Sequence, residues 1–465
     1  MIANAVRDAR GEVVSAADDE VARLYDDAVH AYLGARAESR KRVQAVSESD
    51  PDFALAHCLD GYLGMLSSTR EGIRQALAAL ARARDATKRR PTTSRETAHL
   101  DALDAWVNGD LRGAVARWSA IIHDHPRDIV AIKVSQFVLS YLGESTRMRD
   151  TLAAAMPAWG RATPAFGFLL GCYAYALEES GDYRRAEEYG RQAVEIDPTD
   201  IWAAHAVAHV AEMEGRLQDG LTWITTNTAA WHNCSNFTRH LRWHEGLYHL
   251  DLERHERVIE LYDREVSNPR SDEYLDMANA ASLLWRLEQA GEHVGNRWNA
   301  LADHARRHLR DHALVFVDLH YLMALAGAND VSAVEDFIES CAQFAASVSG
   351  SEAEVMSTVG LPLARAIWAH RRGRYGEAVA ELAPVRSDIR QVGGSHAQRD
   401  VFEQLLIDAA WRGRQHELAA SLLAERTARR PRNIWAWKHF AAVLDETRDA
   451  GAAKAAQTLD RLRRT

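Results

Sequence analysis

Proline residues recur at nearly regular intervals along the first half of the chain. Five of the six prolines in this half, Pro51, Pro91, Pro126, Pro164 and Pro198, are 40, 35, 38 and 34 residues apart. Proline ends α-helices because it lacks the backbone donor and its ring clashes with the preceding turn. A spacing of this size is typical of a repeated helix–turn–helix unit. The prolines therefore predict turns between successive helical hairpins.

The residues between the prolines also repeat. Segments 108–126 and 180–198 each contain Gly-Asp, then an apolar residue, an alanine three residues later, and a proline seventeen residues after the glycine. Gly215 follows Gly181 by 34 residues in the same register. Helix-forming residues dominate, apolar residues recur at spacings of three and four, and strand signals are scarce. The sequence thus predicts an all-α protein.

A unit of this length, with glycine, alanine and a closing proline at these offsets, resembles the tetratricopeptide repeat (TPR), most strongly over residues 98–226. Longer stretches are similar to the tetratricopeptide repeat protein 38 family. They are HAVAHVAEMEGRLQDGL, VGNRW, RDHALVFVDLHYLMALAGAND, VGLPLARA, GGSHAQRDVFEQLLIDAA, PRDIVAIKVSQFVLSYLG and MRDTLAAAMPAW. The resemblance covers most of the chain and implies a cytosolic helical-repeat protein.

We expect one curled α-solenoid of about eight TPR-like helical hairpins, with no internal domain boundary. Residues 1–50 are predicted to form an N-terminal helical segment, and residues 51–440 the superhelix. Residues 441–465 are predicted to form a C-terminal helix that caps it. In proteins of this architecture the first helix of each hairpin lines the concave wall, so we expect the functional residues on first helices.

Composition narrows the classes of partner. The net charge is −10, from 56 basic and 66 acidic side chains, so nucleic acid is not an expected partner. There are few lysines, which limits Schiff-base chemistry. The four cysteines form no CxxC pair, no apolar stretch reaches the roughly 18 residues of a membrane span, and the N-terminus lacks a secretory signal. We therefore expect a cytoplasmic protein without a membrane partner, and a homo-oligomer is compatible with the sequence.

The segment HAVAHVAEMEG places two histidines and an acid on one face of a first helix, predicted over residues 201–214. At about 100° per residue, Trp202, His205, His209 and Glu212 fall within one narrow arc. The alanines between them permit close helix packing. A helix that serves only for packing would carry apolar residues on this face.

The next first helix, predicted over residues 238–251, repeats the pattern with His240, Trp243 and His244 on one face. Adjacent packed helices have axes roughly 8–10 Å apart. The two stripes can therefore converge on one small volume. Histidines and tryptophans also occur as ordinary packing residues, so a purely structural role is the competing interpretation.

Later first helices carry further candidates. Asp318, Arg399 and Asp400 are predicted to close the far side of the site, and Arg399 with Asp400 begins a helix, where anions can bind. His320 is also a candidate for binding. Asp318 and His320 are two residues apart, so a regular helix directs them about 200° from each other and only one can face a given pocket.

Our preferred interpretation is a pocket for a small molecule or short peptide in the concave groove. Zinc is a second interpretation, with His205, His209, His240 and His244 as ligands. The segment HAVAH has Ala206 where a zinc peptidase has its glutamate, so that class is not supported.

Metal-free acid–base catalysis, with hydrolysis as one reaction type, is a third interpretation. Its catalytic candidates are His205, His209 and His244, with Glu212 or Asp318 to orient the imidazole or act as a base. The sequence contains no P-loop, no GxGxxG after a strand and no GxSxG, which excludes several common enzyme classes. An assembly scaffold is the remaining alternative.

Overall fold

The computed structural model describes residues 5–235, 237–268 and 270–464. The fold is an all-α solenoid. Within the described ranges there is no β-strand, and the extended backbone forms two isolated bridges, Arg7 with Val13 and Arg36 with Cys234. Among the same residues, no helix combines the length and apolar character needed to cross a membrane.

The helices follow one another as antiparallel pairs. The first half comprises α1 (Asp19–Leu33), α2 (Ser39–Ser49), α3 (Ala54–Leu66), α4 (Arg70–Arg89), α5 (Ser94–Val107), α6 (Leu111–Asp124), α7 (Ile129–Tyr141), α8 (Ser145–Ala155), α9 (Phe166–Glu179), α10 (Tyr183–Ile196), α11 (Ile201–Met213) and α12 (Leu217–Asn227). The second half comprises α13 (Phe237–Asp251), α14 (His255–Leu261), α15 (Tyr274–Gln289), α16 (Arg297–Arg306), α17 (Val315–Gly327), α18 (Val331–Ser347), α19 (Ser351–Val355), α20 (Leu361–Arg371), α21 (Tyr375–Leu382), α22 (His396–Arg412), α23 (His416–Arg429), α24 (Ile434–Glu446) and α25 (Ala452–Arg464). Short 3-10 or π segments extend several of them: η1 (Met156–Ala158), η2 (Thr228–Trp231), η3 (Tyr262–Val266), η4 (Met356–Gly360) and η5 (Ala383–Val392).

The prolines, capping aspartates and glycines of the repeats explain these helix boundaries. Pro126 and Pro198 each precede, by two residues, an aspartate that caps the next helix: Asp128 accepts from the Ala131 amide and Asp200 from the Ala203 amide. The turns inside the hairpins use glycines with positive φ, such as Gly181 at +83°. Between residues 51 and 440 the described chain forms ten hairpins, from α3/α4 to α22/α23, rather than about eight. The later units lack the regular prolines, which is why the sequence undercounts them.

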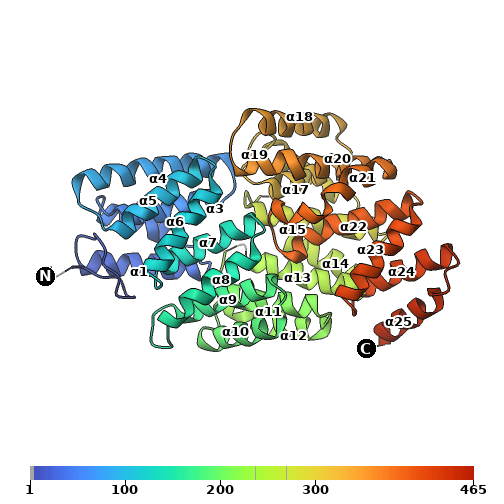
Figure 1. Cartoon of the computed structure of the whole chain (residues 1–465), viewed down its shortest axis with the longest axis horizontal. Coiled ribbons are helices and arrows are strands. Elements are labelled where there is room, and N and C mark those ends of the chain that lie inside the picture. Colours follow the sequence, from blue (N-terminus) through green and yellow to red (C-terminus); the bar gives the residue numbers. More distant parts are fainter. Residues whose placement is uncertain (1–4, 236, 269, 465) are drawn as a thin grey trace.

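The expected boundary at residue 441 falls inside α24. The last unit is therefore a hairpin of α24 and α25 rather than a single capping helix. At the other end, α1 and α2 pack as a pair, preceded by an extended segment, residues 5–18. Figure 1 shows the blue N-terminal and red C-terminal hairpins at opposite ends of the long axis.

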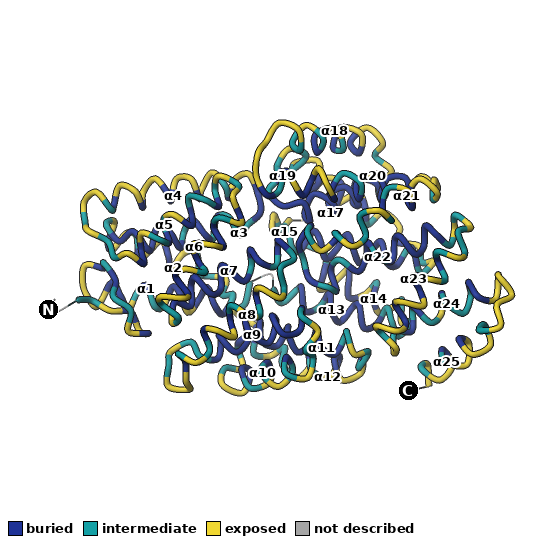
Figure 2. Tube along the Cα trace, in the orientation of Figure 1, coloured by how far each residue is buried: buried dark blue, intermediate teal, exposed yellow. Residues whose placement is uncertain are grey.

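The hairpins build two layers of helices. The first helices of the central units lie inside and are buried over nearly all of their surface; every residue of α17 is buried, for example. Second helices lie outside and bury one stripe; in α10 only Ala186, Gly190, Ala193 and Val194 are buried. Figure 2 shows this contrast as dark inner and yellow outer helices. A helix that is apolar all round must be covered on all sides, so the first helices do not face an open groove.

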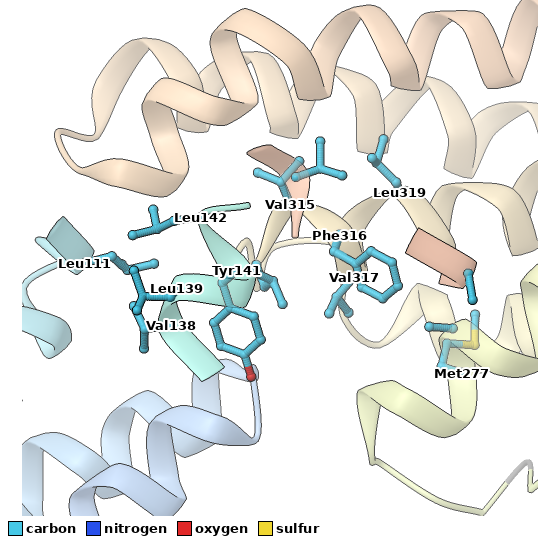
Figure 3. Close-up of a cluster of buried hydrophobic side chains, with 14 of the residues drawn as sticks. Leu111, Val138, Leu139, Tyr141, Leu142, Met277, Val315, Phe316, Val317 and Leu319 are labelled. Carbon is cyan, nitrogen blue, oxygen red and sulfur yellow. The ribbon is translucent and has the colours of Figure 1, made fainter. Parts of the chain in front are cut away.

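Contacts between units far apart in sequence cover the inner helices. We call these contacts the seam. The Ser351 amide donates to the Gly109 carbonyl at 3.0 Å, and the His396 amide to Glu179 Oε1 at 2.8 Å. In Figure 3 the apolar side chains at the end of α7 face those at the start of α17, near Met277 of α15. The solenoid therefore closes on itself, and its concave side is an interior.

Gly143 tests the seam. Its φ is +66°, and a Cβ placed there would overlap the Arg390 backbone carbonyl across the seam. Gly181 has a similar φ of +83° but open space around it. We expect Gly181→Ala to cost about 1 kcal/mol of unfolding free energy from the left-handed backbone alone. Gly143→Ala should cost about 1–2 kcal/mol more because of the overlap, as measured by urea unfolding. Equal losses in the two variants would show that the turns do not meet.

Candidate functional site

The four predicted histidines of α11 and α13 meet in one buried cluster. Each offers a ring nitrogen within 4.8 Å of those of the others, and all four residues are buried. His205 Nε2 lies 3.0 Å from His240 Nε2. The rings of His205 and His209 are 4.2 Å apart between centroids, and those of His209 and His244 are 4.5 Å apart. The small residues of α11 bring the helices this close, and Tyr248 fixes them by donating to the Ala208 carbonyl at 2.6 Å.

Polar groups of α9, α11 and α15 lie against three of these rings. His244 Nδ1 lies 3.0 Å from Glu212 Oε2, and His240 Nδ1 lies 3.0 Å from Asn279 Oδ1 of α15. His209 Nδ1 lies 3.2 Å from a Glu178 oxygen of α9. Sequence reasoning missed Glu178 and Asn279. Glu178 could have been found, because it precedes Glu212 by 34 residues and so occupies the same position one repeat earlier.

Burial controls the protonation of the cluster. Burial lowers the pKa of His205, His240 and His244 well below the usual value, and the neighbouring imidazoles lower it further. For His209, burial would also lower the pKa, but the charge of Glu178 outweighs it and raises the pKa. The cluster therefore holds at least three neutral imidazoles, whose lone pairs can accept a hydrogen bond or bind a cation.

A cavity of about 320 Å³ adjoins the cluster. His205 and His240 form part of its wall, together with Trp202. Aromatic residues supply much of the remaining lining: Tyr32, Phe137, Tyr141, Tyr175, Phe237, Tyr274 and Phe316. The predicted residues thus bring an aromatic surface and two imidazoles to one cavity.

Lys133 of α7 is a cavity residue that the sequence did not single out. It is only 3% exposed, and its Nζ lies 3.7 Å from the centroid of the Trp202 ring. Burial lowers the pKa of its ammonium. The surrounding apolar run, IVAIKVSQFV, was the available signal, because a lysine inside a fully buried helix needs a partner.

Trp243 and Glu212 lie behind the histidines rather than in the cavity wall. Trp243 stacks on His240 at 5.2 Å between centroids and donates to Ser282 Oγ at 3.0 Å. Glu212 borders a second, smaller cavity of about 70 Å³. Burial raises the pKa of Glu212, and the nearby Arg430 partly offsets this effect.

Arg399 and Asp400 lie at the seam, and they point to different partners. Asp400 borders the smaller cavity beside Glu212 and forms a bidentate ion pair with Arg426. Arg399 Nη2 lies 3.2 Å from Glu179 Oε2, and Arg399 lines neither cavity. The predicted anion site at this helix start is therefore occupied by protein carboxylates.

Asp318 and His320 do not join the cluster. Asp318 lies 3.2 Å from His312 Nδ1, whose Nε2 in turn lies 2.7 Å from Ser340 Oγ on α18. His320 Nδ1 donates to the Phe316 carbonyl at 2.7 Å. The expectation that Asp318 closes the far side of the site is wrong, because its face of α17 packs toward α18. The two residues do diverge, as their spacing predicts.

Comparison with known proteins reaches only the level of architecture. No family model matches the chain. Solved structures with a similar course include human IFIT1 as a dimer with m7Gppp-AAAA, at 13% identity and a TM-score of 0.41 over 97% of this chain and 96% of that one. The Naa15/Naa10 complex bound to HypK-THB gives 12% identity and a TM-score of 0.25 over 95% of this chain and 68% of that one. The TPR domain of P58(IPK) gives 15% identity and a TM-score of 0.22 over 79% of this chain and 93% of that one. Function must therefore be argued from the site itself.

Proposed function

We propose that the chain is a helical-repeat binding protein whose cavity holds a compact organic anion with an apolar body. The observation that carries the proposal is the buried ammonium of Lys133, which shares the cavity wall with Trp202 and two imidazoles. A buried cation is costly unless a partner compensates it, and Cys172 and Asp200 offset only part of the effect of burial, which still lowers the pKa of Lys133. A ligand carboxylate beside Lys133 would provide that compensation.

The shape and lining of the cavity support a small ligand. Its volume of about 320 Å³ lies at the lower end of the range for small-molecule sites, so it favours a compact molecule over a peptide. Arg36 and Arg40 line it together with Lys133, while Glu273 is the acid among its described lining residues. This excess of positive charge favours an anion, and the aromatic walls favour an apolar body.

Unused polar groups point the same way. Trp202 Nε1 and His205 Nδ1 are buried and have no hydrogen-bond partner among the described residues. Each such group costs about 1–3 kcal/mol. A ligand oxygen that accepts from Trp202 would recover part of this cost.

Native mass spectrometry of protein purified at low ionic strength is expected to detect a bound organic acid, and calorimetry with a panel of carboxylates should identify its class. Lys133→Met should weaken binding of the best carboxylate at least about tenfold, because a contact to a charged group contributes about 1.5–3 kcal/mol. Lys454→Met is the matched control, because Lys454 is exposed on α25. This variant should bind the same carboxylate with the affinity of the wild type.

The amide of the same acid provides the second comparison. It should bind more weakly than the carboxylate to the wild type and equally to Lys133→Met. If the amide and the carboxylate bind the wild type alike, or if Lys133→Met and Lys454→Met behave alike, the anion pocket is refuted.

A further inference from the structure

We propose that His205, His209, His240 and His244 form a binding site for one divalent transition-metal ion, Zn²⁺ or an ion of similar chemistry. The proposal concerns the four-histidine cluster, of which His205 and His240 also line the cavity, and it does not depend on the organic anion. It starts from the four ring nitrogens that lie within 4.8 Å of one another.

The spacing of the rings suits tetrahedral coordination. Zinc binds imidazole nitrogen at about 2.0–2.1 Å, which places neighbouring ligand nitrogens about 3.3 Å apart. His205 Nε2 and His240 Nε2 already lie 3.0 Å apart. The remaining rings need only small rotations, because every nitrogen of the set is within 4.8 Å of the others.

The outer hydrogen bonds aim the lone pairs inward. His240 and His244 direct Nδ1 at Asn279 Oδ1 and Glu212 Oε2, each at 3.0 Å. Nδ1 therefore carries the proton, and Nε2 keeps its lone pair. Such contacts from the second ring nitrogen to a carboxylate or carbonyl are typical of metal-bound histidines.

Without an ion, the cluster leaves several nitrogens unsatisfied. His205 Nε2 can donate to His240 Nε2, which satisfies that pair. His205 Nδ1, both ring nitrogens of His209 and His244 Nε2 still have no hydrogen-bond partner within the described part of the chain. An ordinary packing cluster would not be expected to leave four buried nitrogens unpaired. A cation between the rings accepts the inward lone pairs directly.

The surrounding charge also suits a dication. Glu178 lies 3.2 Å from His209 Nδ1 and is fully buried, and Glu212 lies against His244. Two carboxylates next to the rings can balance two positive charges in a region that excludes water. Four protein ligands complete a tetrahedral shell, which is the arrangement of a structural site. The ion would therefore pin α11 to α13.

A second group, Asp272 with His304 and His308, could also hold an ion. Asp272 is exposed and lies 3.6 Å from Arg307, so a cation would compete there with the guanidinium. His308→Gln removes one ligand of this group and leaves the four-histidine cluster intact. It therefore serves as the matched control for the proposed site.

The test uses the full chain without a histidine tag, stripped with a chelator and then loaded with Co²⁺ or Zn²⁺. After desalting, elemental analysis should find one equivalent of metal in the wild type and in His308→Gln. The cobalt form should show the strong visible absorption of tetrahedral coordination. His240→Gln and His244→Gln should lose the metal, and Glu212→Gln should bind it about 10–100-fold more weakly.

Substoichiometric metal in the wild type, or weak six-coordinate cobalt absorption, overturns the proposal. So does full retention in His240→Gln with loss in His308→Gln, which would place the ion at the other group. Circular dichroism monitors folding of each variant. If the histidine variants do not fold, the wild-type cobalt spectrum and the Glu212→Gln affinity decide the matter. Because metal content is measured directly, failure here leaves the organic-anion test unaffected.

Discussion

Asp128→Ala is expected to lower the free energy of unfolding by about 3–5 kcal/mol, because it strands a buried charge. Asp128 Oδ2 accepts from Arg95 Nη1 and lies 2.9 Å from His99 Nε2, while Oδ1 caps α7 through the Ala131 amide at 2.9 Å. Arg95 and His99 are both buried. Removing the carboxylate therefore removes a helix cap and leaves a guanidinium without its main counter-charge.

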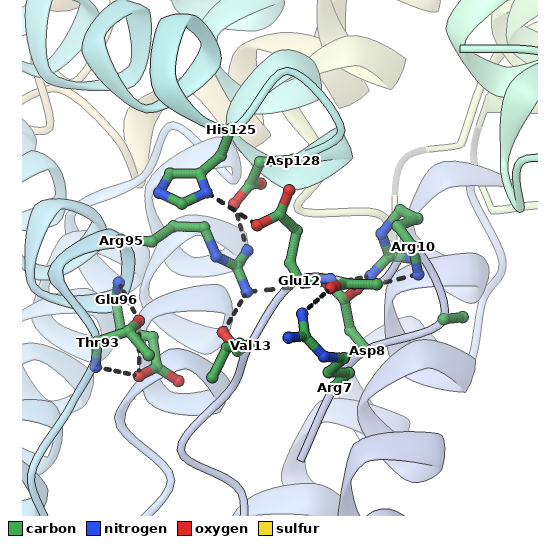
Figure 4. Close-up of polar contacts among 12 residues, drawn as sticks. Arg7, Asp8, Arg10, Glu12, Val13, Thr93, Arg95, Glu96, His125 and Asp128 are labelled. Atoms are coloured by element: carbon green, nitrogen blue, oxygen red, sulfur yellow. Dashed lines mark hydrogen bonds and ion pairs between the residues drawn. The ribbon is translucent and has the colours of Figure 1, made fainter. Parts of the chain in front are cut away.

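The same arginine fastens the extended N-terminal segment. Arg95 Nη2 donates to the Val13 carbonyl at 3.3 Å and lies 3.8 Å from Asp8 (Figure 4). Urea unfolding followed by circular dichroism measures the loss. Asp128→Ala combined with Arg95→Met should be less destabilising than Asp128→Ala alone, because no charge is then left unpaired. If the stability loss of the double variant instead equals the sum of the losses of the two single variants, the two residues act independently.

Acidification should reduce the contribution of Asp128. Burial would raise its pKa, but the neighbouring charges of His99 and Arg95 outweigh burial and hold the pKa well below the usual value. A group whose pKa is depressed by folding stabilises the protein above its unfolded pKa of about 3.9 and loses that contribution as the pH falls. The stability difference between the wild type and Asp128→Ala should thus be constant near neutral pH and shrink below about pH 4.

Arg426→Met should have a loss of similar size, about 3–5 kcal/mol, at the other end of the molecule. Arg426 is 1% exposed, and its two terminal nitrogens bind both oxygens of Asp400, one of them at 2.9 Å. Its Nε also donates to Asn433 Oδ1 at 3.1 Å, just before α24. The substitution leaves a buried carboxylate whose remaining ion pair, with Arg430, spans 3.8 Å.

Arg429 provides the matched control on the same helix. Its side chain is 54% exposed and pairs with Glu403 at the surface. Arg429→Met should cost no more than about 1 kcal/mol, as is usual for exposed ion pairs. Thermal and urea unfolding of both variants would measure the difference. Equal losses would mean that the buried pair of Arg426 and Asp400 contributes no more than a surface pair.

Much of the fold could be predicted from the sequence because the signals are local. Prolines and capping aspartates mark where helices start, and glycines such as Gly181 mark the turns within hairpins. The seam could not be predicted in this way. Gly109 and Ser351 are bonded to each other but lie far apart in the chain, and no periodic pattern connects them. The expected groove thus became an interior with a cavity.

The candidate site shows the same division. The sequence alone shows that histidines four residues apart share one face of a helix, and two such helices in neighbouring repeats must lie close together. Lys133, Glu178 and Asn279 come from other helices, and only the packed structure reveals that they approach the cluster. Asp318 failed as a candidate because the loop before α17 supplies its partner, His312.

The closed arrangement of the hairpins bears on how the chain tolerates shortening. An open repeat array can lose units from either end, because each unit touches only its neighbours. Here the amide of Trp435, in the penultimate helix, donates to Asp251 of α13 at 2.9 Å. Deleting the last hairpin would therefore leave the carboxylate of Asp251, at the end of α13 in the middle of the chain, without this donor. Truncation from the C-terminus should therefore destabilise the whole molecule and not only remove a unit, and few truncated fragments should fold.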